Sequence, residues 1–190
     1  MAELLVRRGG YAAIAGGLLW TGSWLLNVSL TDSSGEGSRL GFSEDEARAV
    51  LNPAILFMVC GVWALRHWLE RRPRHAETGS AAPVTTLGLL LLLAGNLMEF
   101  GIIGTSPIES EDPGFAVFSL GLLTTFIGLV WFAVAGYNAK TLSAWQIAGV
   151  VILPACLIPL ATFGAGWLVW GYILAREKPA DAYSEAPGHS

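Results

Sequence analysis

The stretch Val84–Gly104, VTTLGLLLLLAGNLMEFGIIG, contains 21 residues and a single charged side chain, Glu99. About 20 consecutive apolar residues are needed to cross the hydrocarbon core of a bilayer, which is more than a core helix of a soluble domain needs. The stretch therefore predicts a membrane-spanning helix. A carboxylate inside such a helix is costly unless it has a partner, is protonated or reaches water, so Glu99 marks a position of interest.

Other parts of the chain lack charge in the same way. The uncharged segments lie between Arg8 and Asp32, Arg48 and Arg66, Asp112 and Lys140, and Lys140 and Arg176. Charged residues make up 14% of the chain, against roughly 25% in an average soluble domain. We expect an all-α fold, a polytopic transmembrane helix bundle formed by residues 1–178 as one domain. Residues 179–190 are polar and contain proline, glycine and acid, and are expected to form a disordered tail.

Loop and cap signals divide the bundle into spans. The expected spans are Gly9–Leu30, Glu44–Glu70, Pro83–Gly104, Pro113–Ala139, Leu142–Ile158 and Pro159–Ala175. Pro53 lies inside the second of these and is expected to kink the helix or to free a carbonyl there. The last two could instead be one long kinked helix, since residues 141–175 carry no charge. Such a helix would be about 50 Å long, against a hydrocarbon core of about 30 Å.

The distribution of basic residues favours six spans over five. With the N-terminus inside, six spans place nine of the eleven Lys and Arg residues on the inner side and leave Arg39 and Arg48 outside. Five spans would move Arg176 and Lys178 outside. Inner loops carry an excess of Lys and Arg, so we predict six spans with a cytoplasmic N-terminus. Short acidic outer loops and a basic inner linker are typical of a bacterial inner-membrane protein.

Small and polar residues recur on one helical face in several expected spans, at intervals of three, four or seven positions. The stripes are Thr85, Gly88, Leu92, Gly95, Asn96 and Glu99; Gly121, Thr125, Gly128 and Ala135; Gly10, Ala13 and Gly17; and Gly164 and Gly171. Spans in lipid associate through close packing of such residues, so the stripes predict helix contacts. We also expect Trp20, Trp63 and Trp131 to pack between helices. Cys60 and Cys156 are interpreted as small buried side chains.

Four polar residues of three expected spans share one depth. Glu99 lies five residues before Gly104, which places it about 7–8 Å from the outer end of its span. Asn96 is one turn away, while Asn27 and Asn52 lie near the outer ends of the first and second spans. The layer could be an outer polar cavity that binds a proton, a cation or an amine. It could also be a polar cluster that locks the bundle by hydrogen bonds, which is the interpretation we favour.

Motifs that indicate catalysis, a cofactor or a metal are not found. The sequence contains no HExxH, GxSxG or P-loop pattern. The histidines, which are His67, His75 and His189, form no pair in facing spans, so haem ligation is not expected. There is no long basic face, which argues against a nucleic-acid partner. An inner basic patch, formed by Arg66, His67, Arg71, Arg72, Arg74 and His75, suits contact with anionic lipid headgroups.

The expected function follows from these features. We predict a non-catalytic integral membrane protein that serves as a structural, sensory or accessory component of a membrane assembly. Its partners would be the lipid bilayer and other membrane proteins, without a cofactor. The alternative is a small carrier or channel-like protein that works through the outer polar layer around Glu99.

Overall fold

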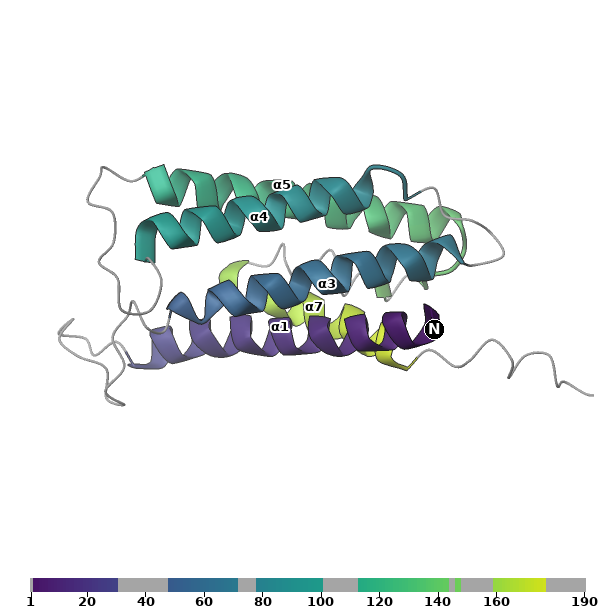
Figure 1. The fold of residues 1–190 in the computed structure, drawn as a ribbon, viewed down its shortest axis with the longest axis horizontal. Coiled ribbons are helices and arrows are strands. Elements are labelled where there is room, and N and C mark those ends of the chain that lie inside the picture. Colours follow the sequence, from purple (N-terminus) through teal and green to yellow (C-terminus); the bar gives the residue numbers. More distant parts are fainter. Residues whose placement is uncertain are drawn as a thin grey trace, which may run out of the picture.

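The computed structural model describes residues 2–30, 48–71, 78–100, 113–143, 146–147 and 159–176. In these ranges the chain forms five long helices and no strand, so the predicted all-α class is confirmed for this part of the chain. The helices are α1 (Ala2–Leu30), α3 (Leu51–Glu70), α4 (Ala81–Phe100), α5 (Pro113–Asn138) and α7 (Pro159–Ala175). They lie side by side as an elongated bundle (Figure 1).

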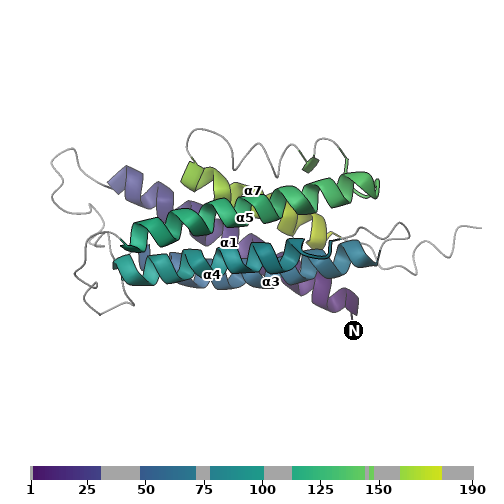
Figure 2. The same ribbon diagram turned by 90° about the horizontal axis from the view of Figure 1, so that it is seen from above.

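The helices form two groups. Helices α4 and α5 make one closely packed pair, while α1 packs against both α3 and α7 in the other group (Figures 1 and 2). Aromatic rings connect the groups in the core. Trp20 of α1 stacks on Phe118 of α5, with ring centroids 6.2 Å apart, and lies 4.9 Å from the ring of Phe163 of α7. The buried core therefore runs between the two groups.

Glycines bring the backbones of α4 and α5 into contact. A methyl group added to Gly121 would lie 2.8 Å from the carbonyl oxygen of Gly88, and one added to Gly95 would lie 2.7 Å from that of Gly114. These pairs also show that the two helices are antiparallel. The predicted packing stripes of these segments are confirmed, because the glycine positions face the partner helix at its backbone.

The same kind of contact joins the first and last described helices. A methyl group on Gly17 would lie 2.6 Å from the carbonyl oxygen of Gly164, and one on Gly171 would lie 2.7 Å from that of Gly10. Helices α1 and α7 are therefore antiparallel. Each of the helices α1, α3, α4 and α5 is also antiparallel to the next one in this order. As a result, α5 and α7 both run toward the end of the bundle where α1 begins (Figure 1).

Several predicted boundaries change. Helix α1 begins at Ala2 rather than at Gly9, because the residues before Gly9 are mostly good helix formers although they include charged side chains. Helix α3 ends at Glu70 as expected and begins at Leu51, whereas the expected start at Glu44 lies outside the described residues. Pro53 is therefore in the first turn of α3, where a missing N–H breaks no helical hydrogen bond. A turn at Val50 separates helical residues 48–49 from α3, and the kink expected from Pro53 stays a prediction.

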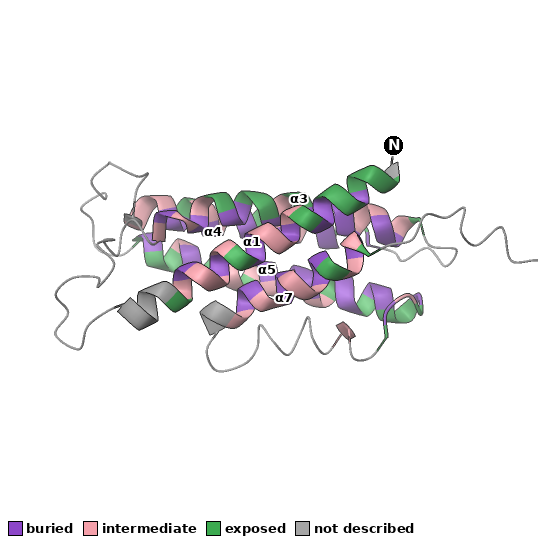
Figure 3. Ribbon diagram, turned by 90° about the horizontal axis from the view of Figure 1, so that it is seen from below, coloured by how far each residue is buried: buried purple, intermediate pink, exposed green. Residues whose placement is uncertain are grey.

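Two tryptophans and a cysteine are placed differently from the prediction. Trp20 is fully buried as expected, but Trp63 is 48% exposed, Trp131 is 44% exposed and the Cys60 thiol is exposed and free. Exposed residues follow the outer sides of the helices (Figure 3). Hydropathy does not distinguish a side chain that faces lipid from one in the core, which explains these errors. Cys156 lies outside the described residues.

Two described helices are long and apolar enough to cross a membrane, judged by length and composition alone. These are Ala81–Glu99 in α4 and Pro113–Asn138, which is α5. The apolar part of α7, Thr162–Ala175, is shorter. Residues 101–104, the expected end of the third span, lie outside the described residues, and so does the expected tail.

Candidate functional site

Asn96 is the most deeply buried polar residue of the predicted site. It lies on α4 with no exposed surface, and its side-chain Nδ2 donates to Oδ1 of Asn52 on α3 at 2.8 Å. The same Nδ2 donates to the backbone carbonyl of Arg48 at 3.2 Å. The structure thus brings together two of the four residues selected from the sequence.

The acceptor atom of Asn96 is left unsatisfied. Its Oδ1 is buried and has no hydrogen-bond partner among the described residues. An unpaired buried acceptor costs about 1–3 kcal/mol, so the position would gain from a donor supplied by a water molecule or a ligand. The cluster therefore presents one buried acceptor oxygen that has no donor among the described residues.

Glu99 lies one turn beyond Asn96 on α4 and is half-buried. A methyl group on Gly114 of α5 would lie 3.1 Å from Cβ of Glu99, so the carboxylate side chain starts at the contact between α4 and the first turn of α5. Asn27 lies near the end of α1, and its side chain is not among those described. The four predicted residues therefore come from helix ends at one end of the bundle. Among them, the structure describes one contact, the hydrogen bond between Asn52 and Asn96.

Two residues that the sequence prediction did not include complete the cluster. The Cζ atom of Arg48 lies 5.0 Å from the ring centroid of Trp24 on α1, which is cation–π geometry worth about 0.5–2 kcal/mol. The spacing held a signal for Arg48, since it precedes Asn52 by four residues and so lies on the same helical face. From the sequence, Arg48 was counted only as an outer-side charge at the start of the second span.

The chemistry available to this cluster is hydrogen bonding and charge pairing. Two amides, a carboxylate and a guanidinium lie at one end of the bundle, without a histidine or cysteine beside them in the described ranges. A group of three or more His, Cys, Asp or Glu side chains that could hold a metal ion is not found among the described residues. Such a cluster can lock helices together or bind a small polar cation, but it offers no nucleophile with an adjacent base.

Comparison with known proteins leaves this geometry as the basis for inference. No protein-family model matches the chain, and searches of curated proteins and of solved structures found no match.

Proposed function

We propose that this chain is a multi-span integral membrane protein of non-catalytic type, a structural, sensory or accessory component of a membrane assembly. We place it in the cell membrane of a bacterium with the N-terminus in the cytoplasm. The observation that carries the proposal is the combination of glycine-lined helix contacts inside the bundle with apolar side chains outside it.

The outer surface of the α4–α5 pair is apolar. Large hydrophobic side chains there are 48–61% exposed, and they are Leu87, Leu90, Phe115, Leu120, Leu123, Ile127, Val134 and Tyr137. Soluble monomers rarely expose a contiguous apolar patch of this kind, whereas lipid tails cover it without a penalty. The surface therefore supports a membrane location for this pair of helices.

The helix directions support six spans. Helices α5 and α7 are consecutive among the long described helices and run in the same direction. This shared direction supports a return crossing by the residues between them, as expected for Leu142–Ile158, most of which lie outside the described residues. A five-span protein with one long last helix would instead make α7 parallel to α1, whereas the contacts of Gly17 with Gly164 and of Gly10 with Gly171 make these helices antiparallel.

Basic residues support the orientation. Six described ones lie at the end of the bundle where α1 begins, namely Arg7, Arg8, Arg66, Arg71, Lys140 and Arg176, and Arg48 lies at the other end. Because cytoplasmic loops are enriched in Lys and Arg, the end where α1 begins is assigned to the cytoplasm.

Reporter fusions test both the location and the span count. Alkaline phosphatase, which is active outside the cytoplasm, would be fused after Gly35, Glu77, Glu109, Lys140 and Ser190. Six spans predict activity at Gly35 and Glu109 and none at the other positions. An active fusion at Ser190 would show five spans, and recovery of the chain in the soluble fraction after cell lysis would refute the membrane location.

A second candidate function is a small carrier or channel-like protein, favoured by the unsatisfied Oδ1 of Asn96 beside Glu99. The site would bind a proton, a cation or an amine. Purified protein in liposomes would be tested for uptake of methylammonium and of protons with an entrapped pH dye. Uptake that is lost in Glu99→Gln while the variant remains folded would support a carrier, and absence of uptake by the unmodified protein would reject it.

A further inference from the structure

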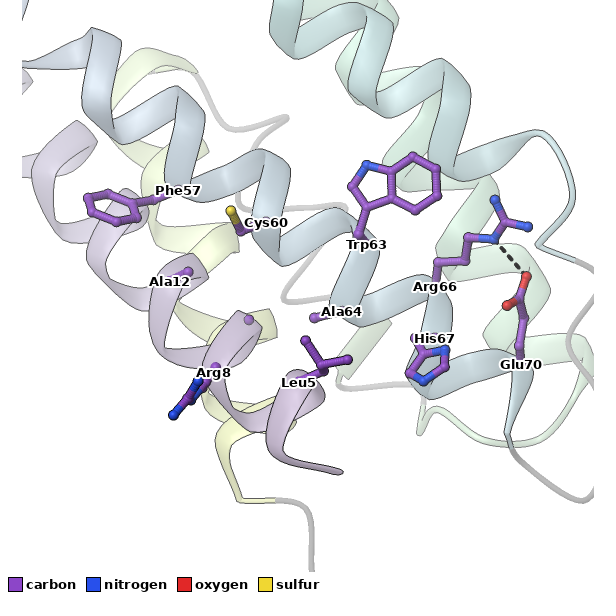
Figure 4. A pocket seen from close by; sticks show the side chains of 11 residues that line it. Leu5, Arg8, Ala12, Phe57, Cys60, Trp63, Ala64, Arg66, His67 and Glu70 are labelled. Carbon is purple, nitrogen blue, oxygen red and sulfur yellow. Dashed lines mark hydrogen bonds and ion pairs between the residues drawn. The ribbon is translucent and has the colours of Figure 1, made fainter. Parts of the chain in front are cut away.

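A groove runs along the surface where α1 packs on α3, at the cytoplasmic end proposed above. It has a volume of about 650 Å³ and opens at the surface. Figure 4 shows side chains from both helices around it, including Ala12 of α1 and Phe57, Cys60 and Trp63 of α3. We propose that this groove binds one anionic phospholipid, with its phosphate near Arg8 and Arg66 and an acyl chain along the apolar wall. The proposal rests on the membrane location argued above.

The depth of the lining residues gives the groove two chemically different ends. Gly9 packs on Ala64, and a methyl group on Gly16 would lie 2.8 Å from the carbonyl oxygen of Ala54, so α1 and α3 are antiparallel. Arg8 is therefore level with the last turns of α3, where Arg66 lies. Phe57 precedes Arg66 by nine residues, which is about 13 Å of helix. A cationic mouth thus continues into an apolar wall along the bundle axis.

The mouth has the charge and the donors for a phosphate. Arg8 is exposed, and Nε of Arg66 contacts Oε1 of Glu70 at 2.7 Å, which fixes the Arg66 guanidinium at the rim (Figure 4). The formal charge of the Arg and Glu side chains that line the groove is positive, because the lining includes two arginines and one glutamate. Nε2 of His67, which also lines the groove, is buried and has no hydrogen-bond partner among the described residues. Because this nitrogen is buried, the donors available to the phosphate are the two arginines.

The wall has the surface for an acyl chain. Phe57 is 41% exposed and Trp63 is 48% exposed, and the Cys60 thiol between them is exposed. Arg66 lies with its Cζ 5.4 Å from the Trp63 ring centroid, so the indole lies directly beneath the cationic mouth. Tryptophan is typical of the headgroup level of a bilayer, and the cytoplasmic leaflet carries the anionic lipids that such a mouth attracts. Charge complementarity therefore selects an anionic lipid over a neutral one.

Native mass spectrometry of the full-length protein in mild detergent tests the proposal. Phosphatidylglycerol and phosphatidylcholine of the same chain length would be added in parallel, with inorganic phosphate in a third series. We expect one phosphatidylglycerol to be retained in preference to phosphatidylcholine, and phosphate not to displace it. Arg8→Gln and Arg66→Gln should each weaken retention about fivefold, since a basic residue near the surface contributes about 1 kcal/mol.

Arg7→Gln is the matched control, because Arg7 is an exposed neighbour on the same helix that does not line the groove. It should leave retention unchanged. Equal losses in Arg7→Gln and Arg8→Gln would show diffuse attraction and overturn the site. Equal retention of the two lipids, or displacement by phosphate, would overturn it as well. These results leave the reporter-fusion test unaffected, so failure of this site is distinguishable from failure of the membrane location.

The apolar wall is tested separately through the native thiol. Bound phosphatidylglycerol should slow alkylation of Cys60 by a maleimide, followed by peptide mass spectrometry. Ala12→Phe should fill the groove and abolish lipid retention, while Ala116→Phe at an exposed position of α5 should not. Unchanged retention in Ala12→Phe would overturn the proposed path of the chain. If that variant fails to fold, the arginine variants still decide the proposal, since Arg8 is exposed and Arg66 is partly exposed.

Discussion

The close approach of α4 and α5 makes a sharp prediction for Gly88→Ala. The added methyl group would lie against the backbone N and Cα of Thr125, with Cα 2.8 Å away. A helix backbone cannot rotate out of the way as a side chain can, so the two helices must separate. Overpacking of this kind costs about 1–3 kcal/mol. The gain in helix propensity from glycine to alanine, up to about 1 kcal/mol, offsets part of that loss.

Gly22→Ala provides the matched control. Gly22 is also a helical glycine, on α1, but a methyl group there would meet nothing within 4 Å. It should leave stability unchanged or raise it by up to about 1 kcal/mol. The free energy of unfolding would be measured for both variants in mixed dodecyl maltoside and dodecyl sulfate micelles. If Gly88→Ala and Gly22→Ala have the same free energy of unfolding, backbone contact between α4 and α5 is refuted.

Two further perturbations address the cluster and the other group of helices. A double-mutant cycle of unfolding free energies should give a coupling of about 0.6–1.7 kcal/mol between Asn96→Ala and Asn52→Ala, the range seen for hydrogen bonds between membrane helices. Zero coupling would contradict the 2.8 Å bond between these side chains. Gly9→Ala should lower thermal stability because its methyl group would contact Cβ of Ala64, and Ala64→Gly in the same chain should restore most of the loss. If Ala64→Gly fails to restore the melting temperature, the assigned register of α1 and α3 is wrong.

The sequence allowed the helix contacts to be predicted well. Glycine at positions 88, 95, 121 and 128 repeats at the spacing of one helical face, and that spacing by itself determines which residues can meet a neighbour. The structure places these glycines between α4 and α5. The depth argument also joined Asn52 to Asn96 correctly, since the rise per residue of a helix fixes how far each lies from the end of its span.

Other features could not be predicted in this way. Trp63 and Cys60 were expected inside the bundle but are exposed. When a helix is apolar on every side, hydropathy does not indicate which side chains face the core. Arg48 was counted only as an outer-side charge of the second span, whereas its carbonyl accepts from Asn96 and its Cζ lies 5.0 Å from the Trp24 ring centroid. That cluster depends on three helices meeting, which spacing within one helix does not specify.

The antiparallel contact of α1 with α7 has a consequence for how the chain is made. Gly17 and Gly164 meet across the bundle although about 150 residues separate them in the chain. At about 5–20 residues per second, the glycine face of α1 waits about 7–30 s for its partner to leave the ribosome. During that interval α1 can already pack on α3, while its glycine face remains uncovered. The bundle is therefore complete only after α7 has been made. A chain that ends before Pro159 would be released with the glycine face of α1 uncovered.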